Sequence, residues 1–99
     1  MDIVREYLDR LTELRQEIDQ IDQQILYFLN RRAETVLAIR ALKAGQDMPL
    51  FAPWREEEIL GRLKSLNPGL FYDQAIEEIF RVILKESLAL MQREDGGVA

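Results

Sequence analysis

Four basic residues lie on or beside the apolar faces of the helices that this sequence predicts. Arg32 and Lys43 fall on the apolar face of a long N-terminal helix, Arg15 lies at the edge of that face, and Arg55 opens the next helix. A cation on an apolar face needs an anionic partner, because an unpaired buried charge is very costly. The partner is either a carboxylate of the protein or a bound anion, and this choice decides the chemistry of the site.

A structural role for these cations is the alternative. Long basic side chains often lay their aliphatic stems on apolar surface and keep the charged head in water. Acidic residues of a neighbouring helix can also neutralise them, because the chain has 18 Asp and Glu against 13 Lys and Arg. Residue types and spacing alone leave both interpretations open.

The composition excludes several classes of chemistry. The chain carries a net charge of -5, which argues against nucleic acid or an anionic membrane as its partner. It contains no cysteine and no histidine, so it lacks a thiol nucleophile, the commonest zinc ligands and the commonest general base near neutral pH. The composition therefore argues against thiol chemistry and against a zinc-thiolate site.

Length and hydropathy predict a single cytoplasmic domain. The first residues, MDIVREYLDRL, lack the continuous apolar stretch of a signal peptide, and no run of about 18 apolar residues exists to span a membrane. Apolar residues make up 47% of the 99-residue chain, which is enough for a core. We expect one domain over residues 1–99 with an ordered core over about 8–92.

The fold class predicted from the periodicity is all-α, with three helices. The first helix runs from about Asp2 to Lys43 without Gly or Pro, and Gly45 then supplies a stop. Apolar residues along it recur mostly at steps of three and four, as one helical face requires. These residues are Leu11, Leu14, Ile18, Ile21, Ile25, Phe28, Leu29, Val36 and Ile39.

Two shorter helices follow. The second begins near Pro53, since proline is tolerated in a first turn, and it ends before a turn at Asn67-Pro68-Gly69. Asp73 is expected to cap the third helix, and residues 94–99 are expected to fray. The apolar side of the third helix contains Ile76, Ile79, Phe80, Ile83, Leu84, Leu88 and Met91.

The length of the first helix predicts a dimer. A helix of about 40 residues is roughly 60 Å long, whereas a compact chain of this size has a radius of gyration of about 13 Å. Two short helices cannot cover the whole apolar face, so we expect a second copy to do so. A break near Asn30 would instead give a compact four-helix monomer.

If the cations bind one small anion, their spacing requires two chains. Arg32 and Lys43 stand nearly in line on the first helix, about 16 Å apart along its axis. Arg15 precedes Arg32 by about 25 Å, so the two arginines of one helix cannot grip one small molecule. In an antiparallel dimer, they can.

The chain resembles the all-helical (AroQ-type) chorismate mutases over about residues 8–92. The resemblance is carried by LTELRQEIDQIDQQILYFLNRRAETVLAIRALK, then by PLFAPWREEEIL and by IFRVILKES. The L-R-x-x-I-D-x-I-D pattern, the arginine of NRRAE, the lysine eleven residues later and the R-E pair after the loop all fall in register. The resemblance implies an intertwined helical homodimer.

The activity that the resemblance implies is an isomerisation in aromatic amino acid biosynthesis. Chorismate would be converted to prephenate by a Claisen rearrangement within one molecule. This reaction needs no nucleophile, acid, base, metal or cofactor, which suits a chain without His or Cys. The protein would hold a chair-like conformer of the dianion and stabilise charge as the C–O bond breaks.

The resemblance also implies roles for individual residues. Arg15 would reach across the dimer and clamp a carboxylate together with Arg32, because guanidinium matches carboxylate in a bidentate fork. Lys43 would donate to the ether oxygen and a carboxylate. Arg55 would order the pocket and its anions, and Glu56 would accept from the ring hydroxyl.

The third helix would complete the pocket. Ser87 would donate to a carboxylate, and Ile39 of the first helix would line the apolar walls together with Leu84 and Leu88. Ser87 and Glu56 each have an ordinary alternative. A helix serine commonly bonds its own preceding turn, and Glu56 could simply favour the start of the second helix through the helix dipole.

Two positions depart from the family pattern. Ala52 stands where many relatives have an aspartate that helps to bind the ring hydroxyl. Met91 stands where relatives usually have Gln or Glu as a donor to the ether oxygen, and its thioether can only accept weakly. Gln92 follows, but one residue rotates the side chain by about 100°, so only a helix irregularity would bring it in. We expect a slow enzyme unless Gln92 substitutes.

These departures support two alternative functions. Ala52 is compatible with a sibling substrate on the same scaffold, as in an isochorismate pyruvate lyase or an aminodeoxychorismate mutase. Met91 is compatible with a weakly active regulatory module that docks on another enzyme of the pathway.

Overall fold

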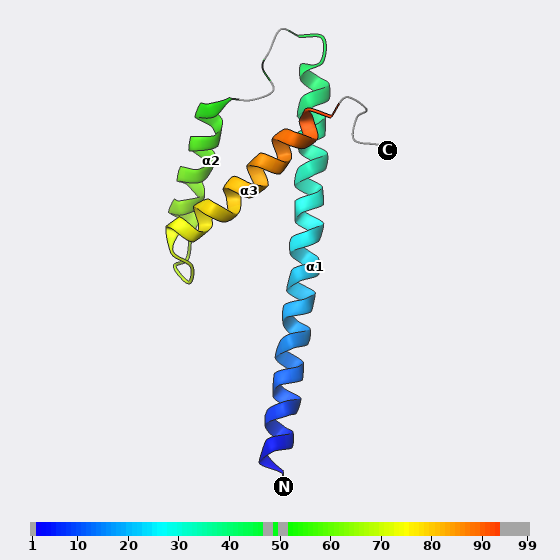
Figure 1. The fold of residues 1–99 in the computed structure, drawn as a ribbon, viewed down its shortest axis with the longest axis vertical. Coiled ribbons are helices and arrows are strands. Elements are labelled where there is room, and N and C mark those ends of the chain that lie inside the picture. Colours follow the sequence, from blue (N-terminus) through cyan, green and yellow to red (C-terminus); the bar gives the residue numbers. More distant parts are fainter. Residues whose placement is uncertain (1, 47–48, 50–51, 94–99) are drawn as a thin grey trace. The chain divides into compact units, whose positions relative to one another are not determined.

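Three helices make up the described part of the chain (Figure 1). The structure is a computed structural model that describes residues 2–46, 49 and 52–93. The helices are α1 (Ile3–Lys43), α2 (Pro53–Leu66) and α3 (Asp73–Met91), and the described residues contain no strand. The all-α prediction is confirmed, whereas the tail expected to fray, residues 94–99, lies outside the described residues.

The helix α1 is continuous over its 41 residues. The chain divides into two compact units, residues 1–34 and 35–99, and the boundary falls within this helix. At Asn30 the helix is regular, and the Asn30 side-chain amide donates to the carbonyl oxygen of Leu26 at 2.9 Å. The alternative of a break near Asn30, which would have given a compact four-helix monomer, is therefore wrong.

Both ends of α1 follow from single residues. The Asp2 carboxylate accepts hydrogen bonds from the backbone N–H groups of Val4 at 3.0 Å and Arg5 at 3.2 Å. Such a cap satisfies donors that have no partner within the first turn of a helix. At the other end Gly45 has φ of 78°, a left-handed conformation that glycine adopts without steric cost.

The predicted apolar face of α1 is exposed in the single chain. No described residue of α1 is buried, and within residues 1–34 the side chain of Phe28 is 66% exposed. The other exposed residues of the predicted face are Leu14, Ile18, Ile21, Ile25 and Leu29, whereas Leu11 and Val36 are half-buried. Although α1 is long, no described helix combines the length and the apolar composition that crossing a bilayer requires. A contiguous apolar face of this kind marks an interaction surface.

The helices α2 and α3 pack against each other around a small core. Leu60 of α2 is only 2% exposed, and Ile59 and Leu84 complete the buried cluster. Leu63 and Phe80 pack against this cluster and are half-buried. Pro53 opens α2 in the first turn, as predicted, where its missing N–H removes no helical hydrogen bond.

The side chain of Asn67 fixes the turn between α2 and α3. Its carbonyl oxygen accepts from the backbone N–H of Gly69 at 3.1 Å, and its amide nitrogen donates to the carbonyl oxygen of Phe71 at 2.8 Å. Gly69 has φ of 100°, a value that favours glycine. The predicted turn at Asn67-Pro68-Gly69 is confirmed.

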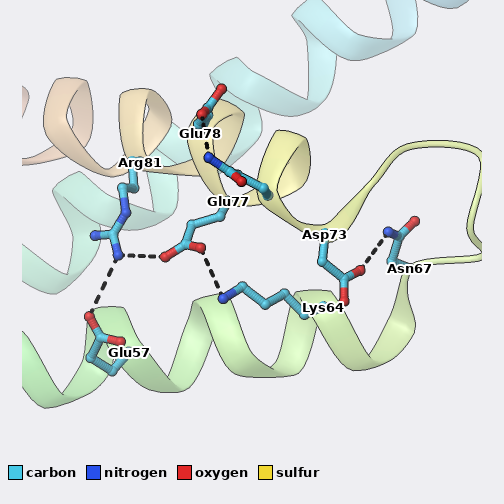
Figure 2. Close-up of polar contacts among 8 residues, drawn as sticks. Glu57, Lys64, Asn67, Asp73, Glu77, Glu78 and Arg81 are labelled. Atoms are coloured by element: carbon cyan, nitrogen blue, oxygen red, sulfur yellow. Dashed lines mark hydrogen bonds and ion pairs between the residues drawn. The ribbon is translucent and has the colours of Figure 1, made fainter.

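The prediction that Asp73 caps α3 was wrong. The helix begins at Asp73 itself, and the preceding Tyr72 makes no side-chain capping bond. The Asp73 carboxylate instead accepts from the Asn67 amide at 2.9 Å (Figure 2), because the short turn brings Asn67 within reach. Within the first turn of α3, the carboxylate still interacts favourably with the helix dipole.

Ion pairs connect α2 and α3 beside the core (Figure 2). The Glu77 carboxylate lies 3.0 Å from Lys64 Nζ and 2.6 Å from Arg81 Nη2, and Arg81 Nη2 lies 3.9 Å from Glu57. The hydrogen bond from Lys64, followed by the one from Arg81, holds the pKa of Glu77 below its usual value. Solvent weakens exposed ion pairs. We therefore infer that these pairs mainly align α2 with α3 and contribute a smaller part of the stability.

We predict that Glu77→Gln lowers the free energy of unfolding at neutral pH and that its difference from the parent protein fades in acid. A carboxyl group whose pKa falls on folding stabilises the protein above its unfolded pKa, about 4.3 for Glu. That contribution is lost as the pH falls through the folded pKa. Urea unfolding followed by circular dichroism, from neutral pH to about pH 3, measures both quantities.

Glu78→Gln is the control for this prediction. Glu78 is the exposed neighbour of Glu77 and has no ion pair within the described ranges. If the two variants differ from the parent protein by the same amount at every pH, the ion pairs of Glu77 do not stabilise the fold.

Candidate functional site

The candidate site residues are divided between the two units of the chain. Arg15 and Arg32 belong to residues 1–34. The others belong to residues 35–99 and comprise Ile39, Lys43, Ala52, Arg55, Glu56, Leu84, Ser87, Leu88, Met91 and Gln92. The first unit thus supplies two guanidinium groups, and the second supplies the remaining cations, the carboxylate, the hydroxyl group and the apolar side chains.

On the first unit, Arg15 has no acidic partner within the described residues. Its side chain is exposed and makes neither an ion pair nor a hydrogen bond there. The nearby Arg10, by contrast, pairs with Glu13 at 3.1 Å. Neutralisation by acids of the same helix therefore occurs on α1 and does not include Arg15, which leaves this guanidinium available to a bound anion.

Arg32 is half-buried on the same helix. The helical rise puts it about 25 Å along the axis from Arg15. Because that span far exceeds the reach of two arginine side chains toward one small molecule, one copy of the helix cannot bring both guanidinium groups onto the same anion.

On the second unit, Lys43 ends α1 and is half-buried. Its Nζ donates to the carbonyl oxygen of Pro49 at 2.9 Å. A carbonyl oxygen is a neutral acceptor, so this bond does not neutralise the positive charge of Lys43. An ammonium group has three donors, and two of them remain for an anion. Ile39 lies one turn earlier on the same face and is 44% exposed.

Ala52 occupies the N-cap position of α2. Its backbone is extended and its side chain makes no capping bond, while its carbonyl oxygen accepts from the N–H of Arg55 at 3.0 Å. An aspartate here would both cap the helix and offer an acceptor to a ligand. Alanine does neither, so this end of the site lacks one carboxylate.

Three successive glutamates at the start of α2 point in different directions, because each residue turns the side chain by about 100°. Glu58 pairs with Arg55 through Oε1 and Nη1. Glu57 lies beside Arg81 of α3. The side chain of Glu56 is half-buried and makes no hydrogen bond or ion pair with any other described residue. Its carboxylate is therefore the acceptor that α2 can offer to a ligand.

One face of α3 carries the candidate residues Leu84, Ser87, Leu88 and Met91, spaced so that they follow one another along the helix. Leu84 is buried, and the other three are half-buried. The Ser87 hydroxyl donates to the carbonyl oxygen of Ile83 at 2.7 Å. The bond is common for a helix serine, and the hydroxyl has to rotate before it can donate to a ligand.

The helix α3 stays regular to its end. Gln92 follows Met91 with φ of -87° and ψ of -3°, and its backbone N–H donates to the carbonyl oxygen of Leu88 at 3.0 Å. The irregularity that would turn Gln92 toward the Ser87 face does not occur in this helix. Met91 occupies that face and Gln92 is exposed, so a catalytic role for Gln92 stays a prediction.

The chemistry that these residues offer is anion binding and hydrogen bonding. They contribute guanidinium and ammonium groups, one half-buried carboxylate and one hydroxyl. Over the described residues, no cluster of three or more potential ligand side chains could hold a metal ion. Two contacts escaped the sequence analysis: the Pro49 carbonyl on Lys43, and Glu58 on Arg55. The spacing of three residues between Arg55 and Glu58 is the signal that could have found the second.

The chain is similar to a known family of proteins. The family model for chorismate mutase type II matches residues 14–92. The bifunctional chorismate mutase/prephenate dehydratase of Aquifex aeolicus is 37% identical over 90 residues, which are 87% of this chain and 25% of that protein. The chain thus spans about a quarter of the length of that curated relative.

Two solved structures are similar over nearly their whole length. Chorismate mutase (form II) from Thermus thermophilus has a TM-score of 0.82 and 39% identity, and the match covers 86% of this chain and 97% of that one. Chorismate mutase from Helicobacter pylori in complex with prephenate has a TM-score of 0.77 and 28% identity, and the match covers 85% of this chain and 91% of that one.

Proposed function

Because the chain belongs to the chorismate mutase type II family, we propose that it catalyses the rearrangement of chorismate to prephenate. The observation that carries the proposal is the set of cations on α1 and at the start of α2, which falls in the register of the family pattern. The match covers 97% of the Thermus thermophilus chorismate mutase, which supports the same activity for this chain. The prephenate in the Helicobacter pylori structure supports the choice of substrate and product.

The reaction suits the groups that the chain provides. One C–O bond of the substrate breaks and one C–C bond forms within the same molecule, so the protein has no atom to donate or remove. Its task is to hold the two reacting ends together and to stabilise the negative charge that develops on the ether oxygen. Cations and hydrogen-bond donors in an apolar pocket can do both.

We propose that the active unit is an intertwined dimer paired along α1. The exposed apolar residues of this helix support that proposal, because a second copy would remove them from water, worth about 25 cal/mol per Å². The separation of the arginines supports it too. In an antiparallel pair, the partner subunit's Arg15 would meet Arg32 and Lys43 of the first chain and complete the site.

Within that site, the proposed roles follow the chemistry of each group. The partner's Arg15 and Arg32 would bind carboxylates, and Lys43 would exchange the Pro49 carbonyl for the ether oxygen and a carboxylate. Arg55 would contribute to the anion pocket, and the half-buried Glu56 would accept from the ring hydroxyl. Ser87 would donate to a carboxylate, while Ile39, Leu84 and Leu88 would form the apolar wall.

One observation favours a second candidate function. Ala52 leaves the start of α2 without a carboxylate, so the site has one acceptor fewer for a substituent of the substrate ring. A sibling substrate, such as isochorismate or an amino-substituted chorismate, would fit a site altered at that position. The choice between these substrates is made by identifying the product.

A link to an enzyme that consumes prephenate is also proposed. The Aquifex aeolicus relative joins chorismate mutase and prephenate dehydratase in one protein, which supports an association of this chain with the next reaction. A cytoplasmic location stays a prediction.

We expect purified protein to consume chorismate and to form prephenate as the sole product. Loss of chorismate absorbance gives the rate, and chromatography with mass detection identifies the product. Release of pyruvate or turnover of isochorismate alone would move the assignment to the sibling reaction. No turnover of any of these substrates would overturn the proposed function.

We predict that Met91→Gln raises kcat/KM on chorismate by at least about tenfold, because a preorganised donor to developing negative charge is worth about 10²–10³ in rate. Met91 lies on the Ser87 face of α3, where such a donor would meet the ether oxygen. Initial rates over a range of chorismate concentrations measure the gain.

Met91→Leu is the matched control, since it changes the shape of the side chain without adding a donor. If leucine raises kcat/KM as much as glutamine does, packing and not hydrogen bonding explains the change. If glutamine gives no gain, position 91 does not face the ether oxygen.

We predict that mixing two inactive variants, Arg15→Ala and Arg32→Ala, restores activity. Equal mixing should return about a quarter of the parent activity, because half of the dimers are mixed and each mixed dimer holds one intact site of two. The rate is measured after subunit exchange, which native mass spectrometry verifies. Complete exchange without recovered activity would show that no site is shared between chains.

A further inference from the structure

We propose that Glu58 is a positioning residue for Arg55, an inference that rests on the proposed function. Its carboxylate accepts a hydrogen bond from one nitrogen of the Arg55 guanidinium in the free protein. The other nitrogens of that guanidinium stay available to a carboxylate of the substrate. Glu58 itself touches no substrate atom. It acts by setting where Arg55 points.

The contact joins Arg55, in the first turn of α2, to Glu58 three residues later. Glu58 Oε1 accepts from Arg55 Nη1, and the two side chains are 55% and 52% exposed. A guanidinium presents five N–H donors in a rigid plane. A single oxygen on Nη1 leaves the Nη2 and Nε donors unused, and these two form the edge that binds a carboxylate in bidentate fashion.

The backbone of Arg55 is already fixed, so the side chain holds the remaining freedom. The Arg55 N–H donates to the carbonyl oxygen of Ala52 at 3.0 Å, within the first turn of α2. An unrestrained arginine side chain samples many rotamers, and ordering it on substrate binding weakens the affinity. The bond to Glu58 restricts that sampling before the substrate arrives.

The neighbouring glutamate provides a matched comparison. Glu57 directly precedes Glu58 on α2, but its carboxylate is beside Arg81 of α3, at 3.9 Å, and not beside Arg55. Removing either carboxylate takes the same charge from nearly the same place. Only removal of Glu58 frees the guanidinium of Arg55.

Positioning and simple charge repulsion predict opposite results. A carboxylate near a doubly negative substrate repels it, so if charge alone matters, removing Glu58 improves substrate binding. If Glu58 positions Arg55, removing it weakens substrate binding. Glu58→Gln separates the two effects further, because the amide oxygen still accepts from Arg55 Nη1 while the charge is gone.

The test is steady-state kinetics of the full chain on chorismate. We expect Glu58→Ala to raise KM about two- to fivefold, the effect that an exposed ion pair can supply, and to leave kcat within about twofold. Glu58→Gln should restore most of the parent KM, and Glu57→Ala should stay near it. Added salt should shrink the difference between Glu58→Ala and the parent protein.

An unchanged or lower KM for Glu58→Ala, with normal turnover by the parent protein, would overturn the role of Glu58 and leave the proposed function intact. An equal rise in KM for Glu57→Ala would also overturn that role, because it would show a general effect of acidic residues near the start of α2. Absent turnover by the parent protein would overturn the proposed function itself and this inference with it.

Discussion

The cost of an unpaired charge on an apolar helix face is the constraint on which the function depends. The helix α1 presents an exposed apolar face, and Arg15, Arg32 and Lys43 lie on or beside it. In the proposed dimer, covering that face would remove water from Arg15 and Lys43, which pair with no carboxylate among the described residues. A buried cation without a counter-ion is strongly destabilising. In the proposed site, a dianion bound among these cations would resolve the conflict. The same groups would then stabilise the negative charge that develops in the transition state.

In the proposed site, the hairpin of α2 and α3 would supply a carboxylate acceptor and a hydroxyl group. Its core is small, centred on Leu60, and the Asn67 side chain and the ion pairs of Glu77 fix the turn and the register. This arrangement holds Glu56 at the start of α2 and Ser87 on α3 as half-buried polar groups on a defined framework. Local polar contacts thus align the two helices beside their small core.

Much of this fold is encoded locally, which is why the sequence predicts it. Absence of Gly and Pro gives the long α1, and Gly45, Pro53 and the Asn67-Pro68-Gly69 turn set where helices stop and start. Asp73 was assigned the wrong role, because its partner, Asn67, comes from the other side of the turn. The four cations were chosen from their place on the helix faces, and the other candidate residues from the family pattern. Side-chain contacts such as that of Lys43 with the Pro49 carbonyl depend on the folded loop and cannot be read from spacing.

A crystal structure with a bound dicarboxylate such as prephenate tests the central claim most directly. The account predicts one ligand per site, with its carboxylates contacted by Arg32 and Lys43 of one chain and by the partner subunit's Arg15. It would be contradicted by density in which these three cations pair with the protein's own carboxylates and the ligand lies elsewhere.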